Sequence, residues 1–349
     1  MVGVIEDKNL FSNVKVIFDC REDDEARTQW LSQRCNSIGG SEIAKIAGYS
    51  KYGSAFTVFN DKMGIGKKFK GNIHTVFGNR MEPLIREWIQ EDFKKSTGVE
   101  MLTFEYPYMM VHKDIECFSA NIDGLASFKT NYRYWENRDT GEIKEIPANK
   151  LIGIEIKTAS EFLKKMWAGE EIPDEYYCQC QWYMGITGLE YFLIVYLLGK
   201  EVKWKVVPRN QDDIDFLFKA GKEFWTNNIL PKIAPEPTGL KKETEDINYM
   251  QCIDNDLETN ISDSKLERYN CISGQLKALE KEKEQLKQLI FLDMGDSKKG
   301  TDGMFKVSRF EVIRENIDSK KLKELYPGTY DEIKKDSTTF VNMRISKLK

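Results

Sequence analysis

The sequence predicts an α/β (α+β) fold with a central mixed sheet flanked by helices. Segments with helical and strand periodicity follow one another in the order helix–strand–strand–strand–helix–strand. The run from Tyr191 to Leu198 is continuously apolar, which is typical of a strand buried on both faces. The chain has 349 residues, 41% hydrophobic and 31% charged, so it can build one large or two modest globular domains.

Hydrophobic spacing and turn residues place the individual elements. Pro83 predicts a boundary or a kink within one long helix, because proline lacks the N–H that a helix interior needs. The polar segment 131–148 predicts an insertion between two strands. Helices are predicted at 22–33, 54–62, 76–93, 161–167, 175–186 and 212–228, and strands at 14–18, 101–111, 116–128, 151–157, 191–198 and 203–207.

A linker with three prolines at 231–237 predicts two domains, 1–235 and 236–349. The second domain is predicted to hold a helical hairpin or short coiled coil, followed by a small α/β tail with strands at 305–312 and 339–345. Packing within the chain is the first interpretation of its hydrophobic stripe, and oligomerisation or partner docking is the alternative. The stripe comprises Tyr269, Ile272, Leu276, Leu279, Leu286 and Ile290, interrupted by Lys283.

Composition excludes several classes of site. The seven cysteines form no C-x-x-C pair, which predicts reduced thiols in a cytoplasm rather than a disulfide framework or zinc ribbon. His74 and His112 are the only histidines, so chemistry must depend on carboxylates, lysine and hydroxyls. No segment reads as a membrane helix or signal peptide. The net charge of −4 neither favours nor excludes nucleic-acid binding.

Two charged residues lie on the apolar strand predicted at 151–157. Glu155 and Lys157 are two residues apart and therefore share one face, whereas Ile154 and Ile156 point to the other. Asp123 precedes Gly124 at the end of the strand before it. One aspartate followed by Glu-x-Lys is the minimal set for metal-dependent phosphodiester hydrolysis, in which carboxylates hold Mg²⁺ and a lysine orients or deprotonates water.

Each of these residues also has an ordinary structural interpretation. An aspartate before glycine is common in tight turns, as at Asp123-Gly124. Glu155 and Lys157 can form a solvated pair on the strand, although their apolar neighbours argue against it. Glu82 alone would most often be a solvent-facing helix residue.

Five short motifs, read together, resemble the YqaJ-type viral recombinases, relatives of lambda exonuclease within the PD-(D/E)XK nucleases. The resemblance covers roughly residues 25–230 and weakens beyond 235. It rests on Arg34 with Ile38-Gly39-Gly40-Ser41-Glu42-Ile43; Gly78-x-x-Met81-Glu82-Pro83; Asn121-Ile122-Asp123-Gly124; Glu155-Ile156-Lys157; and Tyr176-Tyr177-Cys178-Gln179-Cys180-Gln181-Trp182-Tyr183-Met184.

The resemblance implies a Mg²⁺ site, in which Mn²⁺ can substitute. Asp123 and Glu155 would be metal ligands together with the carbonyl of Ile156. Glu82 would complete the acidic cluster near a second metal, and Lys157 would hold the nucleophilic water. The predicted catalytic residues are Glu82, Asp123, Glu155 and Lys157.

The resemblance also implies a DNA phosphate site. Arg34 and Ser41 match phosphate-binding positions, and Ser41 is predicted to cap a short helix. A guanidinium offers fork-like donors, and a helix N-terminus attracts anions. Asn121 and Gln179 match further positions near the DNA, although Asn121 replaces the small hydroxylated residue that is usual there. Gln181 is predicted with them, although it lies two residues from Gln179 on a different helical face.

The function implied is that of a phage or prophage exonuclease that resects double-stranded DNA ends in a bacterial cytoplasm. The resemblance further implies 5′-to-3′ polarity, a cooperating single-strand annealing protein, a trimeric ring and no membrane association. An endonuclease of restriction or repair type is the alternative enzyme, and a DNA-binding scaffold without cleavage is the alternative of another class.

Overall fold

The computed structural model describes residues 2–21, 34–65, 71–137, 140–159, 167, 172–250, 258–259, 261, 264–313 and 317–335. It divides into two compact units, Met1–Cys252 and Ile253–Lys349. The predicted boundary at residue 235 stays a prediction. The helix predicted at 22–33, all of 161–167 except Trp167, and the strand predicted at 339–345 lie outside the described residues.

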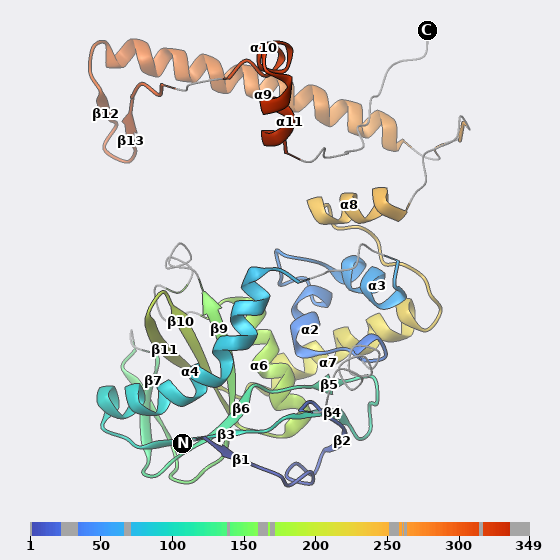
Figure 1. Cartoon of the computed structure of the whole chain (residues 1–349), viewed down its shortest axis with the longest axis vertical. Helices are drawn as coiled ribbons and strands as arrows, with labels where there is room; N and C mark the ends of the chain where they lie inside the picture. Colours follow the sequence, from blue (N-terminus) through green and yellow to red (C-terminus); the bar gives the residue numbers. More distant parts are fainter. Residues whose placement is uncertain are drawn as a thin grey trace. The chain divides into compact units, whose positions relative to one another are not determined.

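A six-stranded mixed sheet forms the centre of the first unit (Figure 1). Its order is β1-β3-β6-β9-β10-β11; β1–β3 and β9–β10 pair parallel, and the other neighbours pair antiparallel. The predicted mixed α/β fold is therefore confirmed. The strands are β1 (Gly3–Val4), β3 (Met101–Glu105), β6 (Gly124–Phe128), β9 (Ile152–Ala159), β10 (Tyr191–Leu198) and β11 (Glu201–Pro208).

The two segments predicted as long strands, 101–111 and 116–128, are each divided between two sheets. Pro107 separates β3 from β4, because proline has no N–H to continue a ladder. The second part of the first segment, β4, and the first part of the second segment, β5, belong to a three-stranded sheet of order β2-β4-β5. These strands are β2 (Val14–Asp19), β4 (Tyr108–His112) and β5 (Ser119–Ala120).

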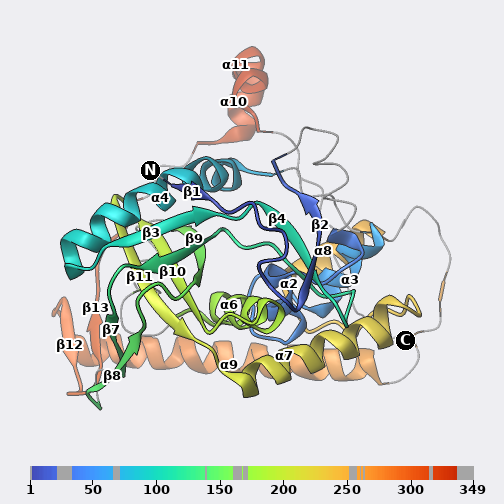
Figure 2. The ribbon, with the colours of Figure 1, turned by 90° about the horizontal axis from the view of Figure 1, so that it is seen from below.

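Helices cover both faces of the central sheet (Figure 2). On one face, Ile85 and Phe93 of α4 pack in one apolar cluster with Ile154 and Ile156 of β9. This confirms the predicted alternation of β9, because Glu155 and Lys157 then face the opposite side. Helix α6 packs on that side, and α7 packs against α6. The helices are α4 (Ile73–Thr97), α6 (Asp174–Thr187) and α7 (Gln211–Phe224), the last extended by a π-helical turn at Trp225–Ile229.

Helix α4 continues through Pro83, so no boundary lies there, and a kink, the other outcome predicted at Pro83, stays a prediction. The helix begins at Ile73, where the side chain of Asn72 accepts a hydrogen bond from the backbone of Thr75 at 2.9 Å. Three apolar residues of α4 at helical spacing are buried, Ile85, Ile89 and Phe93, whereas Leu84 and Trp88 are exposed.

The segment predicted as an insertion is a β-hairpin. Its strands, β7 (Tyr132–Asn137) and β8 (Glu142–Ile146), pair antiparallel. Tyr134 and Ile146 are buried in the apolar cluster that includes residues of α4. The hairpin therefore contributes side chains to the core and is not only a surface loop.

Three further helices, α2 (Gly40–Ile46), α3 (Ala55–Met63) and α8 (Lys241–Met250), belong to the first unit. Glu243 of α8 is buried, and its carboxylate accepts hydrogen bonds from the backbone of Thr238, at 2.8 Å, and of Gly239, at 2.9 Å. It also accepts one from the hydroxyl of Ser54, which caps α3. One carboxylate therefore ties the start of α8 to the start of α3.

The second unit is built around one long helix, α9 (Lys265–Met294), of which only Met294 is buried. A hairpin of β12 (Lys299–Thr301) and β13 (Lys306–Ser308) follows, and β13 is shorter than the strand predicted at 305–312. Helices α10 (Ser319–Leu325) and α11 (Pro327–Ile333) complete the described part. Among the helices described in either unit, none combines the length and apolar character needed to span a bilayer.

Candidate active site

Asp123 links two strands of the central sheet. It stands immediately before β6, which pairs antiparallel with β9, and its Oδ2 accepts a hydrogen bond from the backbone N–H of Ile156 at 2.7 Å. The aspartate is thereby fixed beside the Glu155-Ile156-Lys157 motif. Gly124 does not form the tight turn that the sequence suggested. A Cβ there would lie 2.8 Å from the carbonyl oxygen of Phe104, so glycine is required by close strand packing.

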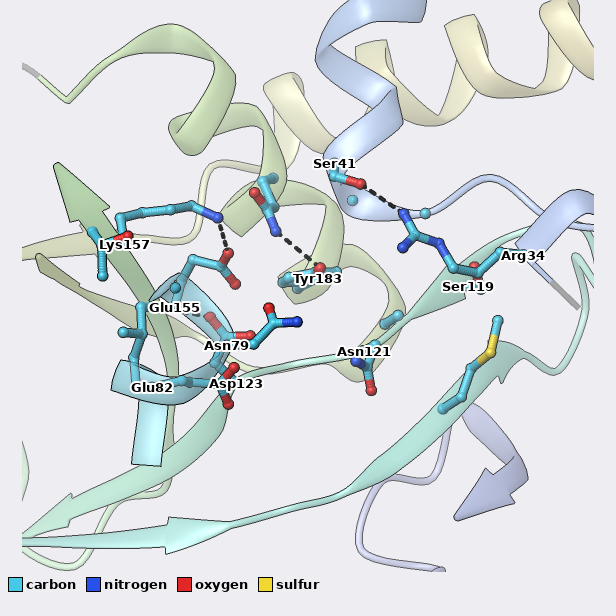
Figure 3. A pocket seen from close by; sticks show the side chains of 18 residues that line it. Arg34, Ser41, Asn79, Glu82, Ser119, Asn121, Asp123, Glu155, Lys157 and Tyr183 are labelled. Atoms are coloured by element: carbon cyan, nitrogen blue, oxygen red, sulfur yellow. Dashed lines mark hydrogen bonds and ion pairs between the residues drawn. The ribbon is translucent and has the colours of Figure 1, made fainter. Parts of the chain in front are cut away.

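Glu155 and Lys157 form an ion pair on the face of β9 that carries the site (Figure 3). Lys157 Nζ lies 2.5 Å from Glu155 Oε1. The side chain of Glu155 is only 1% exposed and that of Lys157 is 22% exposed, so this is no solvated surface pair. The second oxygen of Glu155, Oε2, is buried and has no hydrogen-bond partner among the described residues.

Glu82 reaches the same site from α4. Its Oε1 lies 2.5 Å from a terminal nitrogen of Arg86, one turn further along the helix. The side chain of Arg86 is 6% exposed, whereas that of Glu82 is 34% exposed and lines the pocket. Glu82 is therefore a site residue rather than a free surface carboxylate, as predicted from its motif.

The three carboxylates have raised pKa values. Burial, followed by the charge of Asp123, raises the pKa of Glu155 to about 8 and that of Glu82 to about 7. Burial also raises the pKa of Asp123. Burial alone would lower the pKa of Lys157, but the charges of Glu155 and Asp123 outweigh it and raise the pKa, so the side chain stays an ammonium.

This donor set suits a hard divalent cation. Carboxylate and carbonyl oxygens are the ligands that Mg²⁺ prefers, and buried carboxylates that repel one another are stabilised by a cation. The unpartnered Oε2 of Glu155 supplies a lone pair for that purpose. The described residues contain no ready-made cage of three or more His, Cys, Asp and Glu side chains, so part of the coordination would come from the Ile156 carbonyl, water or substrate.

A second pair of predicted residues, Arg34 and Ser41, lies at the other end of the pocket (Figure 3). A terminal nitrogen of Arg34 donates to Ser41 Oγ at 3.2 Å. Ser41 is not the N-cap of α2; Gly39 is, and the carboxylate of Glu42 accepts from its N–H at 2.9 Å. Gly40 is needed for packing, because a Cβ there would lie 2.5 Å from the ring of Tyr183.

A buried lysine that was not predicted as functional holds this segment in place. Lys62 of α3 has a side chain only 2% exposed, and its ammonium lies 2.9 Å from Glu42 Oε2. It also donates to the backbone carbonyls of Arg34, at 3.0 Å, and Ser37, at 2.5 Å. Lys62 therefore fixes both ends of the segment that carries Arg34 and Ser41.

Hydrogen bonds also connect this segment to the strand that leads to Asp123. Ile38 and Phe118 form a parallel bridge, and the backbone N–H of Ser119 donates to the carbonyl of Ile38 at 2.9 Å. The hydroxyl of Ser37 donates to that of Ser119 at 2.8 Å. Residues 119–123 thus join the Arg34–Ser41 pair to the carboxylates.

The predicted glutamines and asparagine have different surroundings. Asn121 and Gln179 line the pocket, and Gln179 donates to the hydroxyl of Tyr183 at 3.0 Å. Gln181 lies outside it: its amide nitrogen donates to the carbonyl of Pro208 at 2.8 Å, and its amide oxygen accepts from the backbone of Asn210 at 3.0 Å. Gln181 points away because it lies two positions along the helix, so the DNA contact predicted for it is withdrawn.

The pocket that joins these groups has a volume of about 380 Å³. In Figure 3, Glu155 and Lys157 lie on one side and Arg34 and Ser41 on the other, with Tyr183 between them. The residues that line the pocket are Arg34, Gly39, Gly40, Ser41, Gly78, Asn79, Glu82, Met109, Ser119, Ala120, Asn121, Asp123, Glu155, Ile156, Lys157, Thr158, Gln179 and Tyr183.

Several residues that line the pocket or support it were missed by sequence reasoning. Asn79 adjoins the Gly78 motif and could have been found there. Arg86 could have been found as the helical i+4 partner of Glu82. Nothing in the sequence signalled Lys62 or Ser119, because their partners come from other elements.

Comparisons with known proteins agree with the motifs. Residues 29–190 match the family model of the YqaJ-like viral recombinase domain, which confirms that resemblance. The uncharacterized protein YqaJ of Bacillus subtilis (strain 168) is 28% identical over 323 residues, covering 89% of this chain and 92% of that protein. The match therefore extends beyond the first unit into the second.

Two solved structures were also matched. The alkaline exonuclease LHK-Exo from Laribacter hongkongensis is 18% identical, with a TM-score of 0.42, and the match covers 59% of this chain and 94% of that one. A phage-related exonuclease from Haemophilus somnus 129PT is 14% identical, with a TM-score of 0.33, and the match covers 56% of this chain and 96% of that one.

Proposed function

We propose that this chain, whose residues 29–190 are a YqaJ-like viral recombinase domain, is a Mg²⁺-dependent deoxyribonuclease that degrades linear double-stranded DNA from its ends. One observation carries the proposal. A single pocket holds the buried Glu155 and the partly buried Asp123 and Lys157 at one end and the Arg34–Ser41 pair at the other. The first group suits hydrolysis of a phosphodiester, and the second suits binding of a phosphate.

The residues have distinct roles in this proposal. Asp123, Glu155 and the Ile156 carbonyl hold the cation, and Glu82 contributes from α4. When bound there, Mg²⁺ or Mn²⁺ would supply polarisation of the phosphate and acidification of a water molecule. Lys157 orients the attacking water rather than deprotonating it, because its raised pKa keeps it an ammonium that can only donate hydrogen bonds.

Arg34 and Ser41 bind the phosphate at the DNA end. A terminal 5′-phosphate carries more charge and more acceptor oxygens than an internal phosphodiester, so a guanidinium fork distinguishes the two. Asn121 and Gln179 line the path between the two ends of the pocket. We therefore propose 5′-to-3′ digestion, which leaves single strands for a phage annealing protein in the host cytoplasm.

Digestion of end-labelled DNA tests the proposal. Linear duplexes labelled at one 5′ or one 3′ end are incubated with Mg²⁺ or with chelator, beside closed circular DNA. We expect Mg²⁺-dependent loss of the 5′ label, intact circles, and no cleavage by Asp123→Ala or Glu155→Ala. Cutting of closed circles at a similar rate would favour the endonuclease, and binding without any cleavage would favour a scaffold.

Arg34→Ala tests end recognition separately. It should abolish the preference for 5′-phosphate over 5′-hydroxyl ends and keep slow Mg²⁺-dependent hydrolysis. Arg34→Lys should restore only part of the preference, because an ammonium keeps the charge but loses the fork. Arg133→Ala, at a 78% exposed side chain on β7 outside the pocket, is the matched control and should retain the full preference.

A further inference from the structure

Lys157 and Tyr196 are neighbours in the central sheet. Strands β9 and β10 pair parallel in a register that places Tyr196 opposite Lys157. Paired residues of neighbouring strands point to the same face, so Tyr196 lies on the face of β9 that carries the site. The side chain of Tyr196 is buried. The lysine of the site therefore begins beside an aromatic side chain that belongs to the core.

Two further rings form an aromatic stack with Tyr196. The rings of Trp167 and Tyr196 are stacked, with centroids 4.1 Å apart and an angle of 17° between their planes. Tyr176, in the first turn of α6, stacks with Trp167, with centroids 5.5 Å apart and an angle of 12°. Trp167 is also buried, and Tyr176 packs against the apolar cluster that contains the other two rings. Each ring of the stack is thus held by its neighbours.

The stack ends at the ammonium group of Lys157. Lys157 Nζ lies 5.1 Å from the centroid of the Tyr176 ring, which is within the range of a cation–π interaction. Among the residues that the structure describes, Glu155 is the only hydrogen-bond acceptor of this ammonium, through Oε1 at 2.5 Å. An ammonium carries three N–H donors. With one donor on Glu155 and one side against the ring, its rotation is restricted and a donor remains for the pocket.

We propose that Tyr176 is a positioning residue for Lys157. Its ring, supported by the aromatic stack, fixes the direction of the N–H that the lysine presents to the attacking water. A flexible four-carbon stem held by one carboxylate oxygen alone would leave that direction free to vary. The inference deepens the proposed function and rests on it, because it concerns the water that Lys157 orients.

Steady-state kinetics on linear duplex DNA with Mg²⁺ tests this role. Tyr176→Leu removes the ring and should lower kcat by about tenfold with KM within about twofold, because substrate binding does not use the ring. Tyr176→Phe keeps the ring and should restore most of the lost rate. Tyr191→Leu is the matched control and should retain the full rate, because it removes a ring that lies 5.8 Å from Lys150 Nζ, outside the pocket.

A double-mutant cycle separates positioning of the lysine from a general effect on the fold. In the Lys157→Ala background, Tyr176→Leu should lower kcat no further, because the group that the ring positions is gone. Losses that multiply in the double variant would overturn the proposal. Equal losses in Tyr176→Phe and Tyr176→Leu would overturn it as well. Circular dichroism and thermal unfolding check that each variant is folded.

NMR tests the contact without any cleavage. In protein labelled with ¹³C at the ε carbon of lysine, Lys157→Arg identifies the signal of Lys157. We expect its ε protons to be shifted upfield by the ring, with the shift kept in Tyr176→Phe and lost in Tyr176→Leu. An ordinary lysine shift in the unmodified protein would overturn the inference, even if the protein degrades DNA. An upfield signal in a protein that degrades no DNA would contradict the proposed function while confirming the contact.

Discussion

Glu155 is an acid almost fully removed from water, with one oxygen paired to Lys157 and the other unpartnered. Its pKa is raised to about 8 from an ordinary 4.5, by burial first and by Asp123 second. A carboxyl group whose pKa is higher in the folded than in the unfolded state stabilises the fold at pH values below its unfolded-state pKa. That stabilisation is lost as the pH rises through the folded-state pKa. Without divalent cations, the free energy of unfolding should therefore fall between pH 5 and pH 8, by about 1 kcal/mol or more.

Urea unfolding in chelator across that pH range measures the effect. Glu155→Gln should show a much flatter dependence, because its amide does not ionise. Added Mg²⁺ should restore the stability of the unmodified protein at pH 8 and have little effect on the variant. A pH dependence shared equally by both proteins would place the responsible group elsewhere.

Lys157 should affect the reaction more than metal binding. Lys157→Ala should lower the cleavage rate on the order of 10²-fold, because the attacking water loses the donor that orients it. Calorimetric titration should still detect Mg²⁺, and a gel-shift assay should still detect DNA binding. Loss of Mg²⁺ binding in this variant would contradict the role assigned to Lys157.

Side-chain chemistry and spacing predicted which acidic residues lie together, whereas contacts between distant segments were not predictable. Asp123, Glu155 and Lys157 converge because two of them share one strand face and the third begins the neighbouring strand. Gln181 was misplaced because its role depends on which face of α6 meets Pro208 and Asn210. Its spacing of two from Gln179 places it on a different face of the helix, but spacing does not show what that face meets.

At the scale of elements, Lys62 determines how α3 supports the segment before α2. Lys62→Met should destabilise the protein by roughly 2–4 kcal/mol, because Glu42 loses its buried partner and two carbonyls lose a donor. The preference for 5′-phosphate ends should fall as well, while cleavage of 5′-hydroxyl ends persists. Lys95→Met, at a side chain 70% exposed, should change neither denaturation nor end preference.

Substitution of Gly124 tests how closely β6 approaches β3. Gly124→Ala should destabilise the first unit by roughly 1–3 kcal/mol, because the new methyl group meets the backbone of Phe104 and the buried Arg86. Gly274→Ala, in α9 with open space around it, should be neutral or slightly stabilising. Thermal unfolding of the two variants makes the comparison, and equal melting temperatures would show that β6 can shift to accommodate a side chain.

At the scale of the whole molecule, the sequence predicted the order and type of the core elements but not how the chain divides between sheets. Hydrophobic periodicity recovered β10 completely and most of α4 and α6. It could not show that Pro107 moves the chain from one sheet to another, or that α8 stays with the first unit through Glu243. Both outcomes depend on long-range hydrogen bonds that leave no local pattern.

The short connection from Ser119 to Asp123 has a consequence for what the enzyme releases. Hydrogen bonds to Ile38 hold one end of it, and the bond from Ile156 holds the other. In the proposed function, the distance from the terminal phosphate to the bond that is cut is therefore fixed by these five residues rather than by a flexible loop. We expect each turnover to remove a fragment of one constant length, whatever the DNA sequence. Mass spectrometry of the products released early in digestion should show a single nucleotide size, and insertion of one glycine after Ala120 should broaden or shift it.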